Sequence, residues 1–403
     1  MAGMVIIGAG HAAGQAAASL RQEKYDGPIT IIGDEPHVPY QRPPLSKQYL
    51  SGEQDTSRVY LRPQSFYEDK DIDLRLSTRA DAIDAGAKTV TLDDGSTLDY
   101  EKLLVCTGSR ARQLNIEGSN LPGIHYLRTI GDVDGIRAEM EAGKSLVIVG
   151  GGYIGLEVAS VGVEAGLTVH VLEMEDRILQ RVTTPEMSNY YHGLHTSRGV
   201  NIHTNTGVTG FAGDGKVEKV LCGDDVSFDA DLVIVGIGII PNIEIAEAAG
   251  LHCDNGIVVD EHCRTSDEHI YAAGDCTNHP NPLLNRRLRL ESVPNAMEQA
   301  RVCASNMLGG DKTYASIPWF WSDQYELKLQ MVGFSADGDQ QVLRGDMSTN
   351  QFAVFYLSDG KVVAADAVNS AKEFMICKQL IGKPVDTAVL ADPESDLKSL
   401  LQT

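Results

Sequence analysis

Short apolar runs alternate with helix-like stretches along the first two thirds of the chain, and two of these runs open into glycine-rich turns. At both places the pattern predicts a buried strand, a tight turn and a helix. In the first copy these cover residues 4–8, 8–12 and 12–22, and in the second 146–150, 150–152 and 153–165. After each helix a further strand is predicted, over residues 29–32 and 167–172.

Both turns have the G-x-G-x-x-G/A spacing that lets a pyrophosphate approach the N-terminus of a helix. The small residues are Gly8, Gly10 and Ala13 in the first copy and Gly150, Gly152 and Gly155 in the second. A carboxylate that could bind a ribose hydroxyl ends the next strand, Asp34 or Glu35 in one copy and Glu173 in the other. Two complete strand–turn–helix–strand–acid units predict two dinucleotide-binding domains.

The remaining pattern divides the chain further. Strands are predicted over residues 59–61, 74–76, 89–92, 103–108, 231–236 and 270–275, and helices over 132–142 and 184–197. From residue 318 alternating strands appear, over 327–332, 341–343, 352–357 and 362–368, with closing helices over 371–381 and 393–401. Asp-Gly turn signals at residues 93–96 and 358–360 predict hairpins. This last part is predicted to be a small α+β domain.

Length and charge limit the function classes. A chain of 403 residues is expected to form two or three domains. Its net charge of −22 argues against nucleic acid or an anionic membrane as a partner, because both are polyanions. No apolar run reaches the length of a membrane span and no basic leader precedes the first strand, so a cytoplasmic location is expected.

The seven cysteines are scattered, with no C-x-x-C pair and none before Cys106. Several histidines and cysteines lie close together between residues 252 and 279, but their spacing fits no zinc pattern, and we expect no metal site. Neighbouring His and Cys residues on a strand would point to opposite faces. Structural thiols in a reduced compartment are the expectation.

Taken together, these stretches resemble the FAD-dependent pyridine-nucleotide reductases of glutathione-reductase-like architecture, and within them the putidaredoxin-reductase and oxygenase-coupled ferredoxin-reductase group. The most specific segments are Arg42-Pro-Pro-Leu-Ser-Lys47, Glu291-Ser-Val-Pro-Asn-Ala296 and Pro318-Trp-Phe-Trp-Ser-Asp-Gln-Tyr325. The resemblance implies an α/β fold with two Rossmann-like domains, for FAD and NAD, and a C-terminal α+β interface domain. The implied ranges are 1–110 with 241–315 for FAD, 111–240 for NAD and 316–403 for the interface domain.

The same resemblance implies roles for individual residues. Those implied to bind FAD are Gly8, Gly10, Ala12, Ala13, Asp34, Glu35, Arg42, Lys47, Ala80, Thr107, Gly108, Arg128, Asp275 and Val293. Those implied to bind NAD are Gly150, Gly152, Tyr153, Ile154, Gly155, Glu173 and Gly236. Lys47 is expected near the reactive edge of the flavin, with Glu157 as its partner beside the nicotinamide, and Trp321 between the flavin and an iron–sulfur protein.

Disulfide reductases of this architecture need cysteines beside the flavin, in the N-terminal nucleotide domain, where this chain has Ser46 and Lys47. We therefore expect hydride transfer from the nicotinamide to the flavin without a thiol relay, the flavin supplying the redox chemistry. Glu173, Glu175 and Asp176 would repel a 2′-phosphate, which favours NADH over NADPH, although Arg177 follows them.

The expected function is an NADH-dependent ferredoxin reductase that passes single electrons to a 2Fe–2S ferredoxin serving a haem-thiolate monooxygenase or a Rieske dioxygenase. A solvated loop is one interpretation of the basic cluster Arg286, Arg287, Arg289 and Arg301, and a docking patch for an acidic ferredoxin near Trp321 is the other. Packing alone could also explain Trp321. The alternatives are a flavin NADH oxidase, a rubredoxin reductase or a redox-sensing interaction flavoprotein. A monomer or weak dimer is expected.

Overall fold

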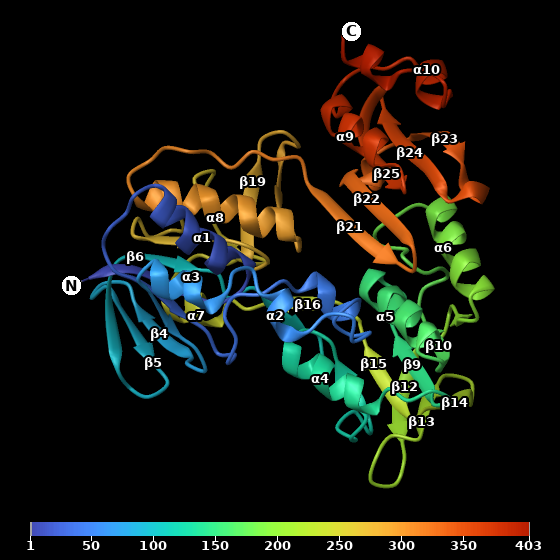
Figure 1. Ribbon diagram of the computed structural model, residues 1–403, viewed down its shortest axis with the longest axis horizontal. Coiled ribbons are helices and arrows are strands. Elements are labelled where there is room, and N and C mark those ends of the chain that lie inside the picture. Colours follow the sequence, from blue (N-terminus) through green and yellow to red (C-terminus); the bar gives the residue numbers. More distant parts are fainter. Residues whose placement is uncertain (1, 403) are drawn as a thin grey trace. The chain divides into compact units, whose positions relative to one another are not determined.

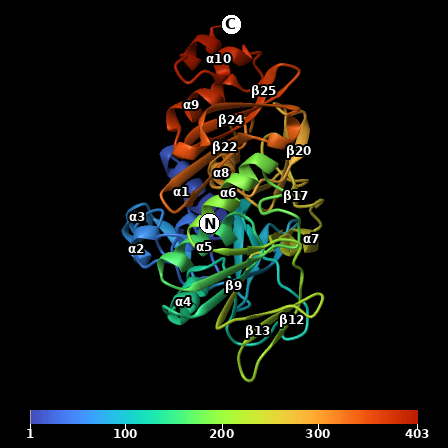
Figure 2. The ribbon, with the colours of Figure 1, turned by 90° about the vertical axis from the view of Figure 1, so that its right-hand side faces the viewer.

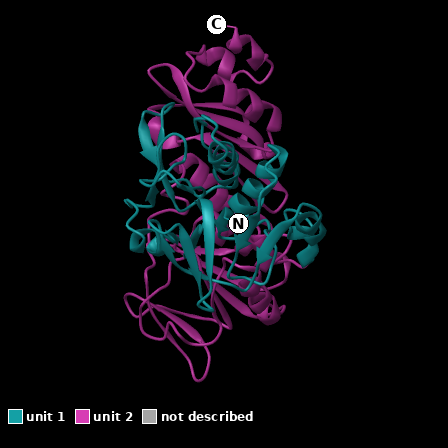
Figure 3. Cartoon of the chain, turned by 90° about the vertical axis from the view of Figure 1, so that its left-hand side faces the viewer, with its two compact units in different colours: residues 1–42, 55–110, 239–318 teal, residues 43–54, 111–238, 319–403 magenta. Residues whose placement is uncertain are grey.

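The computed structural model describes residues 2–402, which fall into two compact units (Figure 3). Unit 1 comprises Met1–Arg42, Asp55–Arg110 and Ile239–Pro318, and unit 2 comprises Pro43–Gln54, Ala111–Gly238 and Trp319–Thr403. Both units therefore combine segments that are distant in the sequence. The three-domain division predicted from the sequence stays a prediction.

The centre of unit 1 is a seven-stranded sheet whose parallel part carries the first glycine-rich turn. Along the sheet the order is β3 (Ile72–Arg75), β2 (Ile29–Ile32), β1 (Gly3–Ile7), β6 (Thr97–Val105), β5 (Thr89–Leu92) and β4 (Ala80–Asp84), with β18 (Ile270–Ala272) paired to β6. The other strands are β7 (Ser109–Ala111), β16 (Ile239–Pro241), β17 (Ile257–Val258), β19 (Thr277–Asn281) and β20 (Arg286–Leu288).

Two helices of unit 1, α1 (His11–Gln22) and α8 (Val293–Met307), pack against each other and lie side by side in Figure 1. Their contact faces are rich in alanine, including Ala13, Ala17, Ala300 and Ala304, so the two backbones can approach closely. The shorter helices are α2 (Thr56–Val59), α3 (Gln64–Asp69) and α7 (Glu244–Ala248).

Unit 2 contains the second glycine-rich turn, in a five-stranded parallel sheet. The strand order is β11 (Asn201–His203), β10 (Thr168–Leu172), β9 (Ser145–Val149), β15 (Leu232–Val235) and β8 (Ile124–Tyr126). Its helices are α4 (Ile130–Glu139), α5 (Tyr153–Glu164) and α6 (Pro185–Ser197), and β12 (Val208–Ala212), β13 (Lys219–Cys222) and β14 (Ser227–Asp229) form a small separate sheet. The 3₁₀ helix η1 (Pro43–Ser46) also belongs to this unit and contacts α4 and α5.

The end of the chain adds a five-stranded antiparallel sheet to unit 2 (Figures 1 and 2). Its order is β21 (Trp319–Gln324), β22 (Leu327–Gly333), β25 (Lys361–Val368), β24 (Gln351–Ser358) and β23 (Gln340–Asp346), with α9 (Ala371–Leu380) packed on it. Short helices follow or interrupt the strands: η2 (Ser335–Asp337), η3 (Met347–Thr349), α10 (Thr387–Ala391) and η4 (Leu397–Leu401). A shared core joins this sheet to α5 and α6, with Leu156 and Met187 against Leu329 and Phe352.

Two of the predicted elements are wrong, and one strand was missed. The stretch 59–61 is not a strand, because Asp55 caps α2 by accepting a hydrogen bond from the Arg58 N–H, and α2 ends at Val59. The closing helix over 393–401 is only the 3₁₀ turn η4, capped by Asp396. Strand β21 was not predicted, because its first three residues are consecutive aromatics without a clear alternation.

No helix among residues 2–402 is both long and apolar enough to span a bilayer.

Asp366 on β25 is a buried carboxyl group inside the core of unit 2. Its Oδ2 accepts hydrogen bonds from the Tyr356 hydroxyl at 2.8 Å and from the Thr183 hydroxyl at 3.0 Å. Burial raises the pKa of Asp366 from its ordinary 3.8 to about 6, although both hydrogen bonds oppose this shift. Asp366 therefore binds its proton more tightly in the folded state than in the unfolded chain.

Since the pKa is higher in the folded state, the stabilisation by this group is complete below pH 3.8 and is lost as the pH rises through about 6. Asparagine resembles the protonated acid, so Asp366→Asn should remove this pH dependence and stabilise unit 2 at pH 8 by roughly 2–3 kcal/mol. Thermal unfolding of the two proteins between pH 4 and 8 tests this. The control, Asp359→Asn, changes an exposed aspartate of the same hairpin. Parallel stability curves for the native protein and Asp366→Asn would contradict the prediction.

Candidate active site

The first glycine-rich turn of unit 1 has the geometry of a pyrophosphate site. Gly8 has φ of 107°, and a Cβ on it would lie 2.2 Å from the carbonyl oxygen of Cys106. Gly10 caps α1, no side chain in the described part of the protein caps the helix there, and a Cβ on Gly10 would meet no described atom within 4 Å. The free N–H groups of the first helical turn can therefore bind an anion. This fits the diphosphate of FAD.

Charged side chains gather near the end of β2. The Glu35 carboxylate accepts hydrogen bonds from the Tyr40 hydroxyl at 2.6 Å and from the Arg42 guanidinium at 3.0 Å, whereas Asp34 is exposed. Burial works against the charge of Arg42, but Tyr40, Glu35 and Asp275 together raise its pKa. Arg42 is thus paired with Glu35, and its positive charge is also stabilised by Asp275, which lies beyond the end of β18.

Asp275 belongs to a polar cluster at the carboxyl ends of β6 and β18. The Ser109 hydroxyl donates to Asp275 Oδ2 at 2.8 Å. Thr107 and Asn242 exchange two hydrogen bonds, of 2.6 and 3.0 Å, and Gly108 between Thr107 and Ser109 has φ of 64°. Parallel-strand carboxyl ends are where α/β sheets bind ligands. The structure thus groups the predicted residues Thr107, Gly108 and Asp275.

The remaining predicted FAD residues are more scattered. Ala12 and Ala13 are buried on α1, Val293 is the first residue of α8, and Ala80 begins β4 and packs against the core of unit 1. Arg128 lies in unit 2, where its backbone N–H donates to Asp132 at 3.0 Å. The roles of these residues stay predictions.

The second glycine-rich turn has the same construction in unit 2. Gly150 has φ of 110° and a Cβ on it would lie 2.4 Å from the Gly236 carbonyl oxygen, while one on Gly155 would lie 2.2 Å from that of Gly150. At Gly152, which caps α5, an added Cβ would have no described atom within 4 Å. A nicotinamide dinucleotide fits here as FAD does in unit 1. Ile154 is exposed beside it, and the Tyr153 hydroxyl points away, to Met331 Sδ at 2.9 Å.

Glu173 is fixed at the end of β10 by backbone donors. Its Oε2 accepts from the N–H of Gly151 at 2.8 Å and its Oε1 from that of Glu175 at 3.0 Å. Arg177, which would favour a 2′-phosphate, donates instead to the backbone carbonyls of Thr183 and Gln180, each at 3.0 Å. The charge that lines this strand end is therefore mainly negative.

Lys47 and Glu157 form a buried ion pair within unit 2. Lys47 Nζ lies 2.7 Å from Glu157 Oε2, with side chains 10% and 4% exposed. The Ser46 hydroxyl donates to the same oxygen at 2.5 Å, and the Ser322 hydroxyl donates to Oε1 at 2.6 Å. Glu157 follows the second glycine-rich turn on α5, so the sheet that carries the nucleotide site also positions this pair.

Trp321 lies on β21 against Trp319, with ring centroids 5.6 Å apart. Successive residues of a strand point to opposite faces, so Ser322 and Gln324 point into the core while Trp319 and Trp321 share the other face. The sequence analysis missed Ser322 and Gln324 as site residues. The available signal was their spacing of two residues directly after the tryptophans, which places both side chains on one face of a strand.

The basic cluster lies in unit 1 and is partly tied to the fold. Arg287 donates to Asn278 Oδ1 at 3.0 Å and to the Val259 carbonyl at 2.9 Å, and Arg289 pairs with Glu291 at 2.6 Å. The side chains of Arg286 and Arg301 are exposed.

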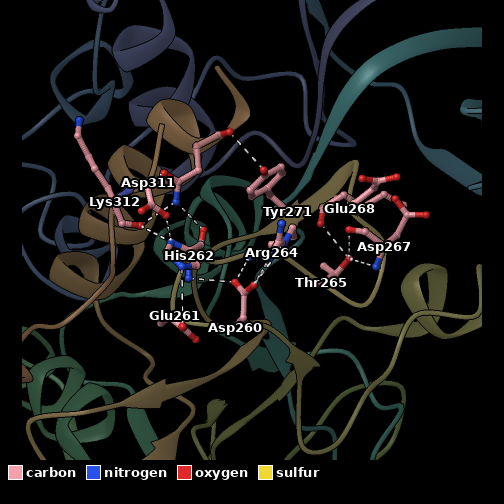
Figure 4. Close-up of polar contacts among 12 residues, drawn as sticks. Asp260, Glu261, His262, Arg264, Thr265, Asp267, Glu268, Tyr271, Asp311 and Lys312 are labelled. Atoms are coloured by element: carbon pink, nitrogen blue, oxygen red, sulfur yellow. Dashed lines mark hydrogen bonds and ion pairs between the residues drawn. The ribbon is translucent and has the colours of Figure 1, made fainter. Parts of the chain in front are cut away.

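In the histidine–cysteine region, His262 and Cys263 are part of the fold. His262 Nδ1 donates to the Lys312 carbonyl at 3.1 Å, and Asp311 and Glu261 lie nearby (Figure 4). Cys263 is fully buried next to it. In the described residues no three His, Cys, Asp or Glu side chains are arranged to hold a metal ion. Burial also raises the pKa of Cys106 well above its ordinary value and that of Cys276 to about 11.

Comparison with known proteins decides the family. Residues 3–300 match the model for pyridine nucleotide-disulphide oxidoreductases, and residues 319–401 match the reductase C-terminal model. The chain belongs to the pyridine nucleotide-disulphide oxidoreductase family. As a member of this family it is an oxidoreductase that uses FAD and a pyridine nucleotide.

Relatives in this family are similar over almost their whole length. Rhodocoxin reductase of Rhodococcus erythropolis is 43% identical over 398 residues, which cover 98% of this chain and 93% of the relative. Putidaredoxin reductase of Pseudomonas putida is 43% identical over 406 residues, which cover 99% of this chain and 96% of the relative. In a solved covalent complex of putidaredoxin reductase with putidaredoxin, the matching chain has a TM-score of 0.96 and 43% identity, covering 100% of this chain and 98% of that one.

Replacing Glu173 tests the nucleotide site of unit 2. We expect Glu173→Ala to raise the KM for NADH about tenfold or more, because it removes both the acid and the acceptor for the Gly151 N–H. The FAD content should not change. Steady-state kinetics and the flavin absorbance of the purified variant measure the two quantities, with Glu175→Ala as the neighbouring control. An unchanged KM for NADH would remove Glu173 from the ribose site.

Proposed function

We propose that this oxidoreductase transfers electrons from NADH through FAD to a 2Fe–2S ferredoxin, which feeds a haem-thiolate monooxygenase or a Rieske dioxygenase. Bound FAD would accept a hydride, and hence two electrons, and release them one at a time. The observation that carries the proposal is the buried ion pair between Lys47 and Glu157, the latter on the nucleotide-binding helix, in a chain with no cysteine before Cys106.

The ion pair would act by positioning. Lys47 also donates to the Pro43 carbonyl at 3.0 Å, so its ammonium group is held between η1 and α5. The carboxylate of Glu157 is held by two serine hydroxyls besides the lysine. Such a fixed charge pair beside a nucleotide would orient the nicotinamide ring and exclude water, which raises the rate of hydride transfer without a covalent intermediate.

The preference for NADH is supported by the charges at the end of β10. Glu173, Glu175 and Asp176 would repel a 2′-phosphate. The guanidinium of Arg177 is already bonded to two backbone carbonyls, so it is poorly placed to compensate. A 2′-hydroxyl, which is uncharged, fits this strand end better.

A ferredoxin as partner is supported by the similarity to a reductase solved in complex with putidaredoxin and by the arginines on and near β20. Ferredoxins of the proposed kind are small and acidic, so positive side chains would steer their encounter with a protein that is otherwise acidic. Of these arginines, Arg286 is chosen for the test because its side chain is exposed on β20.

The proposal predicts that a 2Fe–2S ferredoxin accelerates the reduction of cytochrome c by NADH at least about tenfold. Unchanged rates with accumulating peroxide would indicate a flavin NADH oxidase, and acceleration by rubredoxin alone would indicate a rubredoxin reductase. Arg286→Glu should lower the ferredoxin-coupled rate several-fold and weaken its salt dependence, whereas turnover with ferricyanide stays unchanged.

The control is Arg58→Glu, which makes the same charge change at an exposed position of α2. A general effect of net charge would lower the coupled rate equally in the two variants. If ferricyanide turnover falls together with the coupled rate in Arg286→Glu, Arg286 has a structural role and not a docking role.

A further inference from the structure

The Lys47–Glu157 pair is the end of a longer chain of buried polar side chains in unit 2. Gln324 Nε2 donates to Ser322 Oγ at 3.1 Å, and Gln324 Oε1 lies 2.7 Å from His195 Nε2. On its other side His195 Nδ1 lies 3.2 Å from the Tyr325 hydroxyl. Ser322, Gln324 and His195 are 0%, 1% and 0% exposed. Together with Glu157, to which Ser322 donates, these four side chains form one chain of direct hydrogen bonds.

The charge of Glu157 fixes every proton in this chain. A carboxylate can only accept, so the single O–H of Ser322 must donate to Glu157 Oε1. Ser322 can then only accept from Gln324, which turns the amide nitrogen toward Ser322 and the amide oxygen toward His195. His195 must therefore carry its proton on Nε2, and its bare Nδ1 must accept from Tyr325. All donors point toward Glu157.

The local environment agrees with a neutral His195. Burial lowers the pKa of His195 to about 4, although the hydrogen bond with Gln324 opposes this. An imidazolium would donate from both nitrogens and could not accept from the Tyr325 hydroxyl. The amide of Gln324 does not pass protons on, so the chain orders its members and is not a proton wire.

Tyr325 is held at the far end of the chain by an unusual backbone conformation. It is the first residue of the two-residue turn between β21 and β22, and its φ of 55° lies in the left-handed region that a tyrosine seldom adopts. Its ring lies 5.1 Å from that of His195, and the Arg198 guanidinium lies 5.1 Å above it. Arg198 also pairs with Glu326 at the surface. Such strain at a non-glycine residue suggests that the side chain has a specific task.

We propose that Ser322, Gln324 and His195 are positioning residues of the Lys47–Glu157 pair, forming a one-directional donor chain that fixes the Glu157 carboxylate. Cooperative hydrogen bonding along the chain strengthens the last bond, the one to the carboxylate. The C-terminal sheet thereby takes part in the chemistry of the nucleotide-binding helix. This rests on the proposed function, in which the pair serves the oxidation of NADH.

The first test is independent of activity. Long-range ¹⁵N NMR of the holoenzyme labelled at histidine reports the tautomer of each imidazole, and the His195→Gln variant identifies the signal among the eleven histidines. We expect His195 to be the neutral Nε2–H tautomer between pH 5.5 and 8. A protonated ring or the Nδ1–H tautomer would overturn the proposed direction of the chain.

The second test measures how a substitution at Ser322 affects both the His195 tautomer and the rate of flavin reduction. In Ser322→Ala the amide of Gln324 no longer has to donate there and can turn over, so His195 should populate both tautomers. The anaerobic rate of flavin reduction at saturating NADH should fall about tenfold, roughly the effect of one hydrogen bond to a charged group. The Kd for NADH should change less than this rate.

Ser160→Ala is the matched control. Ser160 is another buried serine, but its hydroxyl donates to the backbone carbonyl of Glu157 at 2.7 Å and not to the carboxylate. Its removal should leave the His195 tautomer and the reduction rate near those of the native protein. Equal losses in Ser160→Ala and Ser322→Ala would show general damage to packing around α5 and would overturn the proposal.

The double variant Lys47→Met/Glu157→Gln separates this inference from the proposed function. It removes both buried charges together and leaves no unpaired one. If this variant reduces its flavin at the native rate, the proposed role of the pair is wrong. If it is slow while Ser322→Ala reduces at the rate of Ser160→Ala, the role of the pair stands and the positioning chain is wrong.

Discussion

The structure of unit 2 depends on one buried carboxylate. Glu157 is 3% exposed, and its side chain accepts hydrogen bonds from Ser46, Lys47 and Ser322. Taking a charge out of water costs several kcal/mol unless it is paired and hydrogen bonded, so these donors have to be in place together. They come from η1, from the residue after it and from β21. Two segments that are far apart in the sequence, 43–47 and β21, are thereby joined to helix α5.

This constraint explains how the fold combines binding and chemistry. The glycine-rich turn at Gly150 and Gly152 needs only small residues and free N–H groups, which are common to many nucleotide sites. One turn further along the same helix, Glu157 adds a fixed charge. The redox chemistry would belong to the cofactor, and the contribution of the protein is to hold the charged groups in one geometry.

Much of this was predictable from the sequence, because glycine spacing and terminal acids depend on local geometry. The strands over 29–32 and 89–92, the hairpin turns and the ends of α1 and α5 follow directly from the pattern. Less was predictable where tertiary contacts decide. Ser322 and Gln324 are polar residues at strand positions that face the core, where apolar residues are expected. His195 is separated from Gln324 by more than a hundred residues. Only the folded sheet brings them to Glu157.

The central claim is that electrons pass through the flavin alone, without a redox-active disulfide. An anaerobic titration of the holoenzyme with NADH tests this most directly, because a flavin takes up two electrons and a flavin with a redox-active disulfide takes up four. The account predicts complete bleaching of the flavin absorbance at one NADH per FAD with no further uptake. Consumption of a second equivalent would contradict it.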